Sequence, residues 1–419
     1  MLKIGSMVCA IALIAASLAY GTSRAADGGL TLAEAQRRAV ERSRSLAGQD
    51  AAIAAAHEMG RAASELPDPV LRLGVDNMPI SGEDRYSLTR DSMTMKRIGL
   101  MQEITRGEKR ELRAERYERE AERATAEKEA TIATIQRDTA LAWLDRYYAE
   151  AMAAVLAEQA SQVRSEIAAA EGAYRGGRAS QSDVIGAHAT LAALEERASE
   201  YASRIAIAKV NLARWMGNGA DAPLASPPAM DGVRLAGGTL EEHLATHPEI
   251  VALERQEKVA ATEARLAQAL SKPDWSVEFA YQKRGSDFGD MVSFGVSIPL
   301  PWDRANRQDR DIAAKLAQAE QARAQRDEVL RSHTGEVRAM LEEWQNKRER
   351  LGRYERDLVP LARERTRAAT AAYQGGRTGI AELLLARRGE SDVRLQWVQL
   401  QNETARLWAR LNYLIPEQQ

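Results

Sequence analysis

The chain has 419 residues, of which 28% are charged and 5% are aromatic, and its formal net charge at pH 7 is −2. A charge this close to zero excludes the strongly basic surface of a nucleic-acid-binding protein, and it is not acidic enough to suggest disorder. The sequence also lacks a phosphate-binding loop, a dinucleotide-binding fingerprint and a nucleophile–base set. We therefore expect no enzyme activity, no cofactor and no nucleic-acid partner.

Residues 1–25 have the pattern of a secretory signal peptide. A basic start at Lys3 is followed by an apolar run over residues 7–19 and then by small and polar residues. The apolar run is too short to span a membrane as a helix. Cys9, the only cysteine, lies inside this segment. The mature chain is therefore predicted to contain no disulfide and no thiolate metal site.

After this leader, the same order of segments occurs twice. The motif AYRGGR at 173–178 returns as AYQGGR at 372–377, 199 residues later. Similarly, the Pro-Asp pair at 67–68, which precedes a strand-like run, returns at 273–274. These offsets are much longer than the period of a solenoid protein. We predict a duplication, with a first repeat over 26–230 and a second repeat over 231–419.

Long stretches without proline predict long helices in both repeats. Residues 107–174 are rich in Ala, Glu, Arg, Leu and Lys, and their apolar residues recur at steps of three and four. Such a helix is about 100 Å long, and a second helix is expected over 180–216 after the Gly-Gly pair. The second repeat predicts helices over 306–373 and 378–414, with a bend at Pro360. We expect two coiled-coil-like arms rather than one compact domain.

Two strand-like runs precede each long helix. Residues 275–282 and 292–300 alternate strictly between apolar and polar, 71–76 do so clearly, and 93–104 do so more weakly. Each run is close to the length of a tilted transmembrane strand. Four strands cannot close a barrel, and lipid does not tolerate open edges, so several chains would have to share one barrel. The same pattern is also typical of a small soluble sheet packed on helices.

Three short segments, together with the order of helices and strands, resemble those of a known protein family. The Tyr-x-x-Gly turn occurs in both repeats, residues 100–110 read LMQEITRGEKR, and residues 296–301 read VSIPLP. With the order of helices and strands, they resemble the TolC-like outer membrane factors of bacterial tripartite efflux systems over nearly all of the mature chain. The segment 100–110 is similar to the entry into the long helix in the heavy-metal branch of that family. That branch exports cobalt, zinc and cadmium, or copper and silver.

The resemblance implies a mainly α fold with a small β part, assembled as a homotrimer. Its strands would form a twelve-stranded outer membrane β-barrel in contact with lipid, and its long helices a periplasmic α-helical barrel in a Gram-negative bacterium. The implied function is a passive exit duct for heavy-metal cations, docked to a periplasmic adaptor (membrane fusion) protein and an inner membrane RND-type pump. One alternative is a TolC-like channel for organic drugs or type I protein secretion. A second is a periplasmic coiled-coil adaptor or structural protein, which would carry one helical hairpin rather than two.

The resemblance also implies that the Gly-Gly turns are the periplasmic tips, where adaptors dock and the channel gates. Glycines permit a tight reversal and leave backbone groups uncovered, and the arginine beyond each turn can add charged hydrogen bonds. The alternative is an ordinary helix–helix turn. The predicted docking residues are Tyr174, Gly176, Gly177, Arg178, Tyr373, Gly375, Gly376 and Arg377.

Two carboxylates, Asp183 and Glu382, stand nine residues after the two tip tyrosines. In the family, an acidic residue at the position of Glu382 lines the closed aperture, and three chains would give a ring that attracts cations. Leu385 stands where a drug-efflux member has a second acidic residue, which argues against a second ring. The alternative is that both carboxylates are solvated charges favoured by a helix N-terminus.

No metal site is expected. Thioether sulfurs could bind Cu(I) or Ag(I), but methionine more often fills irregular apolar gaps. His243 and His247 have the spacing of helical metal ligands, but Pro248 interrupts that turn and no third ligand is near. A conduit needs only weak sites for its cargo, because the cargo must leave. The methionines concerned are Met93, Met95 and Met101.

Overall fold

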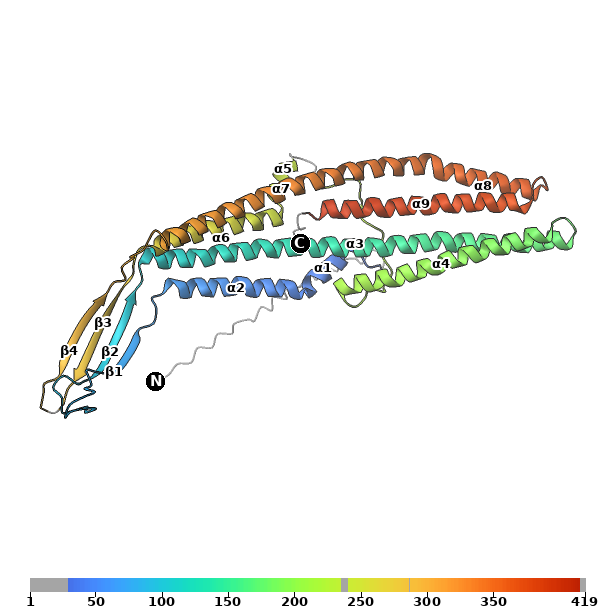
Figure 1. Cartoon of the computed structure of the whole chain (residues 1–419). Helices are drawn as coiled ribbons and strands as arrows, with labels where there is room; N and C mark the ends of the chain where they lie inside the picture. Colours follow the sequence, from blue (N-terminus) through green and yellow to red (C-terminus); the bar gives the residue numbers. More distant parts are fainter. Residues whose placement is uncertain (1–28, 235–239, 286, 415–419) are drawn as a thin grey trace, which may run out of the picture.

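The structure, a computed structural model, describes residues 29–234, 240–285 and 287–414, so the predicted leader lies outside it. The molecule is elongated, with a sheet at one end and two helix–helix turns at the other (Figure 1). Within the described ranges, no helix combines the length and the apolar composition needed to cross a membrane.

The order α-α-β-β-α-α occurs twice, and the long helix of the second repeat is divided into three consecutive pieces. The elements are α1 (Leu32–Arg42), α2 (Arg44–Ser64), β1 (Val70–Asp76), β2 (Met95–Ile104), α3 (Gly107–Arg175), α4 (Gln181–Met216), α5 (Leu240–Ala245), α6 (Pro248–Leu270), β3 (Trp275–Lys283), β4 (Met291–Ser297), α7 (Gln308–Arg353), the π-helical turn η1 (Tyr354–Leu358), α8 (Val359–Gln374) and α9 (Ile380–Asn412).

The four strands form one antiparallel sheet in the order β1-β2-β3-β4. The central β2–β3 ladder, from Ile104 opposite Trp275 to Lys96 opposite Lys283, joins the two repeats in one sheet. In the described chain, β1 and β4 each pair with a single neighbour, so the outer edge of each strand carries unpaired backbone groups.

The strand bounds differ from the sequence prediction at two ends. Strand β4 stops at Ser297, although apolar alternation continues beyond it, because Pro299 lacks the N–H needed to extend the ladder. Strand β2 begins at Met95, not at Met93. The backbone N–H of Met93 instead donates to Asp91 Oδ1 at 2.7 Å, in a local turn.

Helix α3 is 69 residues long, about 100 Å, and its partners change along its length. It packs on α2 and α6 toward the sheet, and on α4 and α9 toward the turns. Small residues such as Ala121 and Ala124 are buried in the part near the sheet, whereas Leu156, Val163 and Ile167 are buried in the second part. Small side chains allow helices to approach closely, so the sheet-proximal half of α3 can be enclosed by two neighbours at once.

The largest core cluster lies around the middle of α3. Trp143, which is fully buried, donates its indole N–H to the Leu30 carbonyl at 3.1 Å. Leu30 also bridges to Leu224 in the linker that follows α4. Arg146, 2% exposed, donates to the Ala220 carbonyl and pairs with Glu150 at 2.7 Å. The start of the chain and the linker are thereby fastened to α3 by buried hydrogen bonds, whose loss would leave buried polar groups unpaired.

The bend predicted at Pro360 is present. The π-helical turn η1 separates α7 from α8, and α8 begins one residue before Pro360. Proline has no N–H for the carbonyl four residues earlier, and its ring collides with that carbonyl in a regular helix. The wider π turn makes room for the ring, so the arm changes direction there (Figure 1).

The two long helices differ in how much of their surface the chain covers. Helix α3 contacts α1, α2 and α4 from its own repeat and α6 and α9 from the other. Helix α7 packs against α5, α6 and α9, all from its own repeat, and its buried side chains are Val337 and Trp344. In α3, one side packs against α6 and α9 of the other repeat. The equivalent side of α7 has no such partners and is uncovered in the described chain.

His247 caps the N-terminus of α6, where its Nδ1 accepts a 3.3 Å hydrogen bond from the Glu249 N–H. It is 9% exposed, and its ring centroid lies 4.5 Å from that of His333. Burial, helped by His333 and Arg137, lowers the pKa of His247 from 6.5 to about 4. The folded chain therefore holds this imidazole neutral at neutral pH.

We expect acid to destabilise this helix start through His247. As pH falls below 6.5 the unfolded chain takes up the proton first, so stability is lost between pH 6.5 and 4, by about 2 kcal/mol at pH 5. His247→Asn can still accept a capping hydrogen bond but does not titrate. Hydrogen exchange of the α6 amides should accelerate less between pH 7 and 5 in this variant than in the wild type, after correction for intrinsic exchange. Equal pH dependence in both proteins would contradict the assignment.

Candidate functional site

One face of the sheet is apolar and exposed. Cross-strand neighbours on this face form two continuous rows over all four strands, and every member is at least 40% exposed. A contiguous apolar surface of this kind marks contact with lipid or with another protein rather than with water. The first row is Leu71, Leu100, Phe279 and Phe294, and the second is Leu73, Ile98, Tyr281 and Val292.

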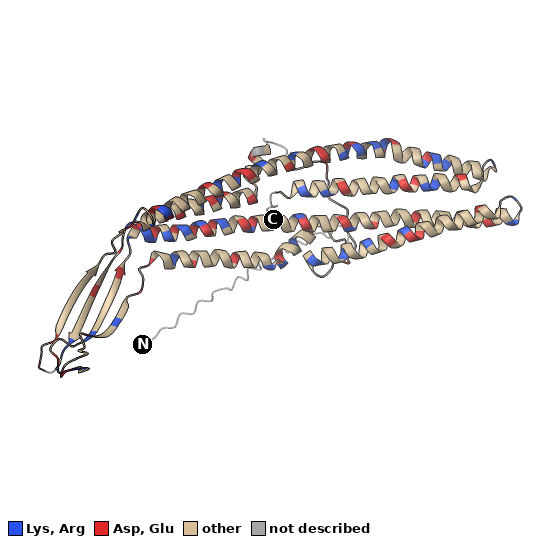
Figure 2. Cartoon of the chain, viewed as in Figure 1, with Lys and Arg blue, Asp and Glu red and all other residues tan. Residues whose placement is uncertain are grey.

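The opposite face of the sheet carries a charge network that the sequence analysis did not identify. Glu278 in β3 accepts hydrogen bonds from Arg97 in β2 and, at 3.2 Å, from Arg72 in β1. Arg97 also lies 3.6 Å from Asp76. These pairs link three strands on the polar face, and the period-two positions of the polar residues were the available signal. The sheet thus separates an apolar surface from a charged one. Charged residues are few on the strands and frequent along the helices (Figure 2).

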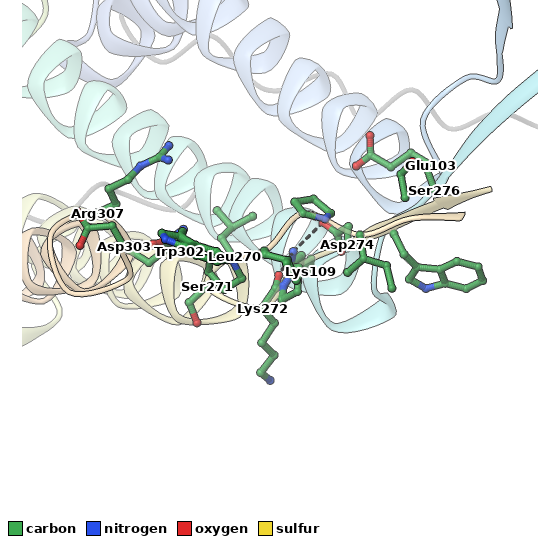
Figure 3. A pocket seen from close by; sticks show the side chains of 18 of the residues that line it. Glu103, Lys109, Leu270, Ser271, Lys272, Asp274, Ser276, Trp302, Asp303 and Arg307 are labelled. Atoms are coloured by element: carbon green, nitrogen blue, oxygen red, sulfur yellow. Dashed lines mark hydrogen bonds and ion pairs between the residues drawn. The ribbon is translucent and has the colours of Figure 1, made fainter. Parts of the chain in front are cut away.

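A junction of buried polar contacts connects the sheet to α3. Asp274, just before β3, accepts from Lys109 Nζ at 2.6 Å and from the Arg106 N–H at 3.0 Å. Partial burial alone would raise the pKa of Asp274, but the hydrogen bonds from Lys109 and Arg106 outweigh it and hold that pKa below its usual value. The pair borders a pocket of about 800 Å³ that reaches to Trp302 and Arg307 at the start of α7 (Figure 3).

At the other end of the molecule, the two Gly-Gly turns have the same backbone hydrogen bonds. In the first, Gly177 N–H donates to Tyr174 O at 3.0 Å and Arg178 N–H to Ala173 O at 2.8 Å. In the second, the corresponding distances are 3.0 and 2.9 Å. Each helix thus ends in the double hydrogen bond of a Schellman motif.

Only the second glycine of each pair is required by the backbone. Gly177 and Gly376 have φ of +71° and +67°, a region that other residues adopt only with strain. Gly176 and Gly375 have ordinary negative φ values. A Cβ on Gly176 would lie 3.5 Å from its nearest neighbour, an ordinary contact. The first glycine of the first turn is therefore not demanded by the fold.

The two tip tyrosines are not in equivalent surroundings. Tyr373 packs against a cluster formed by α3, α4 and α9, which includes Val163 and Ile380. Tyr174 is 47% exposed. Both tip arginines, Arg178 and Arg377, are exposed. The sequence repeat predicted equal roles for the tyrosines, but in one chain only Tyr373 packs against the cluster between the two arms.

The two carboxylates beyond the turns also differ. Asp183 forms a capping box with Ser180: it accepts from the Ser180 N–H at 3.0 Å, while its own N–H donates to Ser180 Oγ at 3.1 Å. These bonds lower the pKa of Asp183. Glu382 lies in the first turn of α9, is exposed, and makes no hydrogen bond or ion pair within the residues that the structure describes. Asp183 thus has a local structural role, whereas Glu382 does not.

The residues tested as metal ligands do not converge. His243 lies in α5 and His247 precedes α6, so the two do not share one helix. Met95 and Met101 lie on β2, while Met93 lies before it. In the described ranges, no three His, Cys, Asp or Glu side chains gather closely enough to hold an ion.

Comparison with known proteins supports this architecture. Residues 239–415 match the family model described as outer membrane efflux protein. No curated protein matches the chain.

Several solved structures share the fold over more than nine-tenths of the chain. The outer membrane protein VceC of Vibrio cholerae is 22% identical, with a TM-score of 0.74, and covers 91% of this chain and 95% of its own. The outer membrane channel CmeC of Campylobacter jejuni is 12% identical, with a TM-score of 0.77, and covers 99% and 93%. CusC, described as forming a transmembrane channel, is 15% identical, with a TM-score of 0.77, and covers 92% of each chain.

Proposed function

We propose that this chain, whose residues 239–415 match the family model described as outer membrane efflux protein, is one of three identical subunits of an exit duct for heavy-metal cations. The match of residues 239–415 to that family model and the shared fold support an outer membrane efflux protein rather than an enzyme. The observation that carries the channel reading is the sheet, which has one exposed apolar face, one charged face and two open edges. In lipid such a sheet requires neighbours at both edges.

Uncovered surfaces on the sheet and on the long helix α7 support a ring of copies. The open edges of β1 and β4 lie at the two sides of the sheet. Helix α3 also has partners from the other repeat, α6 and α9, whereas α7 packs only against elements of its own repeat in the described chain. If the copies are related by rotation about one axis, each copy can cover the open strand edge and the uncovered side of α7 in the next copy. Three copies would close a barrel of twelve strands, with the charged face of each sheet toward the lumen.

The turns at the far end are proposed as docking tips for a periplasmic adaptor, which would connect the duct to an inner membrane pump. Support comes from Gly176, which is exposed and has no conformational need to be glycine, and from the exposed guanidinium of Arg178. An uncovered backbone next to a charged donor suits a partner's side chains. The second turn offers the same pair in Gly375 and Arg377.

Glu382 is proposed as the aperture residue, in preference to Asp183. It is exposed and has no partner among the described residues, whereas Asp183 is engaged in its capping box. Three copies of Glu382 would place a ring of negative charge near the periplasmic end of the duct, which would raise the local concentration of cations.

The choice of heavy-metal cations as cargo rests on the similarity of residues 100–110 to the heavy-metal branch. A channel for organic drugs or secreted polypeptides has the same fold. The family match and the second helical hairpin disfavour a periplasmic adaptor.

A strain that lacks this protein should separate the two kinds of cargo. We expect hypersensitivity to one or more of the salts of cobalt, zinc, cadmium, copper and silver, restored by the wild-type gene, and no change for organic drugs. The minimal inhibitory concentration of each compound is the measurement. Sensitivity to drugs alone would overturn the metal assignment and leave the channel intact.

Bulky residues at the first tip glycine should block docking without disturbing the turn. Gly176→Trp keeps an allowed φ but covers the backbone, so adaptor binding by the purified trimer is expected to weaken at least about tenfold. Gly176→Ala is the matched control, because its Cβ fits at ordinary contact distances. Unchanged binding by Gly176→Trp and by Gly375→Trp would refute the docking role of the tips.

Charge selectivity in planar lipid bilayers tests the aperture. Glu382→Gln removes the proposed ring, so the preference for cations over anions, read as a reversal potential in a salt gradient, should decrease. Asp183→Asn is the control: it weakens the capping box and should leave the reversal potential unchanged. A preserved preference in Glu382→Gln would place the aperture elsewhere.

A further inference from the structure

The contacts that join the two repeats inside the chain lie at the start of α3. Lys109, 2% exposed, donates to Asp274 Oδ2 and to the Lys272 carbonyl, both at 2.6 Å. The Arg106 backbone N–H donates to Asp274 Oδ1, and its Nε donates to the Pro273 carbonyl, both at 3.0 Å. A Pro-Asp pair ahead of one strand thus holds two basic residues at the start of the preceding repeat's long helix.

A Pro-Asp pair and two basic residues also occur at the outer ends of the chain, with arginine in place of Lys109. Arg304 and Arg307 stand 198 residues after Arg106 and Lys109, and the Pro-Asp pair at 67–68 stands 206 residues before the pair at 273–274. The Pro-Asp pair at 67–68 leads into β1, and the two arginines lie between β4 and α7. Both sets therefore lie beside the two open edges of the sheet.

Within one chain these residues do not form a junction. Asp68 is exposed, and the structure gives it no hydrogen bond or ion pair among the residues described. The same holds for the side chain of Arg307, which lies apart from the Lys109–Asp274 pair in Figure 3. Helix α7 has no side-chain cap, and residues 302–307 form turns. In the internal junction, by contrast, the helix already begins at Gly107.

We propose that Asp68 of one copy binds the start of α7 in the adjacent copy, where Arg307 and the Arg304 backbone N–H take the places of Lys109 and the Arg106 N–H. The partner that binds at the start of α7 is thus a second copy of this chain. Strand β1 of that copy would pair antiparallel with β4, as β3 pairs with β2. The inference rests on the proposed ring of copies and names the contact that closes it.

The intersubunit junction would differ from the internal one in one respect. The internal junction has a second ion pair, Lys272 with Glu108 at 2.7 Å. The equivalent positions are Leu66 and Asn306, which cannot form one. The junction between copies therefore lacks this second ion pair and should depend more strongly on Asp68.

Cross-linking tests the contact directly. Cys9 lies in the predicted leader, so Asp68→Cys with Arg307→Cys in one chain gives two unique thiols. A short bismaleimide should convert the purified outer membrane protein into covalent dimers and trimers on a denaturing gel. Each single variant should remain monomeric on the same gel. Lys109→Cys with Asp274→Cys is the matched control, which should react within one chain and give no ladder.

A charge exchange tests the energetics without a cross-linker. Asp68→Arg should reduce the ratio of trimer to monomer in mild detergent by about tenfold or more, because two positive groups would face each other. Adding Arg307→Asp should restore the trimer. Glu65→Arg makes the same charge change three residues earlier, at an exposed residue with no described ion pair, and should have little effect.

The outcomes separate this inference from the proposed function. A trimeric wild type that gives no ladder in the Asp68/Arg307 double variant, or no rescue on charge exchange, overturns the junction alone. A wild type that is monomeric by mass measurement in detergent overturns the ring of copies and the junction with it. A ladder together with rescue supports both.

Discussion

The structure depends on one constraint: an antiparallel sheet with an apolar outer face cannot leave backbone groups unpaired in lipid. The chain places Leu73 and Phe294 on that face and leaves the outer edges of β1 and β4 free. Unsatisfied backbone groups cost several kcal/mol each in hydrocarbon, so the edges require partners. The charge network around Glu278 lies on the other face, which in the proposed ring of copies would line a polar interior.

The duplication explains how one chain can be both well packed and incomplete. Helix α3 packs against α6 and α9 of the second repeat as well as against its own repeat, whereas α7 packs only against elements of its own repeat in the described chain. The same difference appears at the tips, where Tyr373 is packed and Tyr174 is half exposed. Each of these differences is removed if the next copy repeats the internal arrangement. The differences between the two repeats within one chain are therefore those expected if copies of the chain are arranged symmetrically around a ring.

Much of the fold could be predicted from local patterns. Helix bounds agreed within about two residues, because Gly-Gly pairs, capping residues such as Ser180 and proline-free runs act locally. The end of β4 was missed because apolar alternation continued past the point where Pro299 stops the ladder. The Arg72–Arg97–Glu278 network and the role of Asp183 depend on cross-strand register and on cap geometry, which periodicity does not encode. The aperture and docking roles remain predictions.

Nitroxide labels on the sheet would test the central claim, that one face contacts lipid and the other lines an aqueous lumen. Single cysteines at Leu73, Ile98 and Phe294 would report the apolar face, and cysteines at Arg72 and Ser293 the polar one. In proteoliposomes we expect the first set to collide more with oxygen, which partitions into lipid, and the second more with a water-soluble nickel chelate. Equal access of the chelate to both faces would contradict the account.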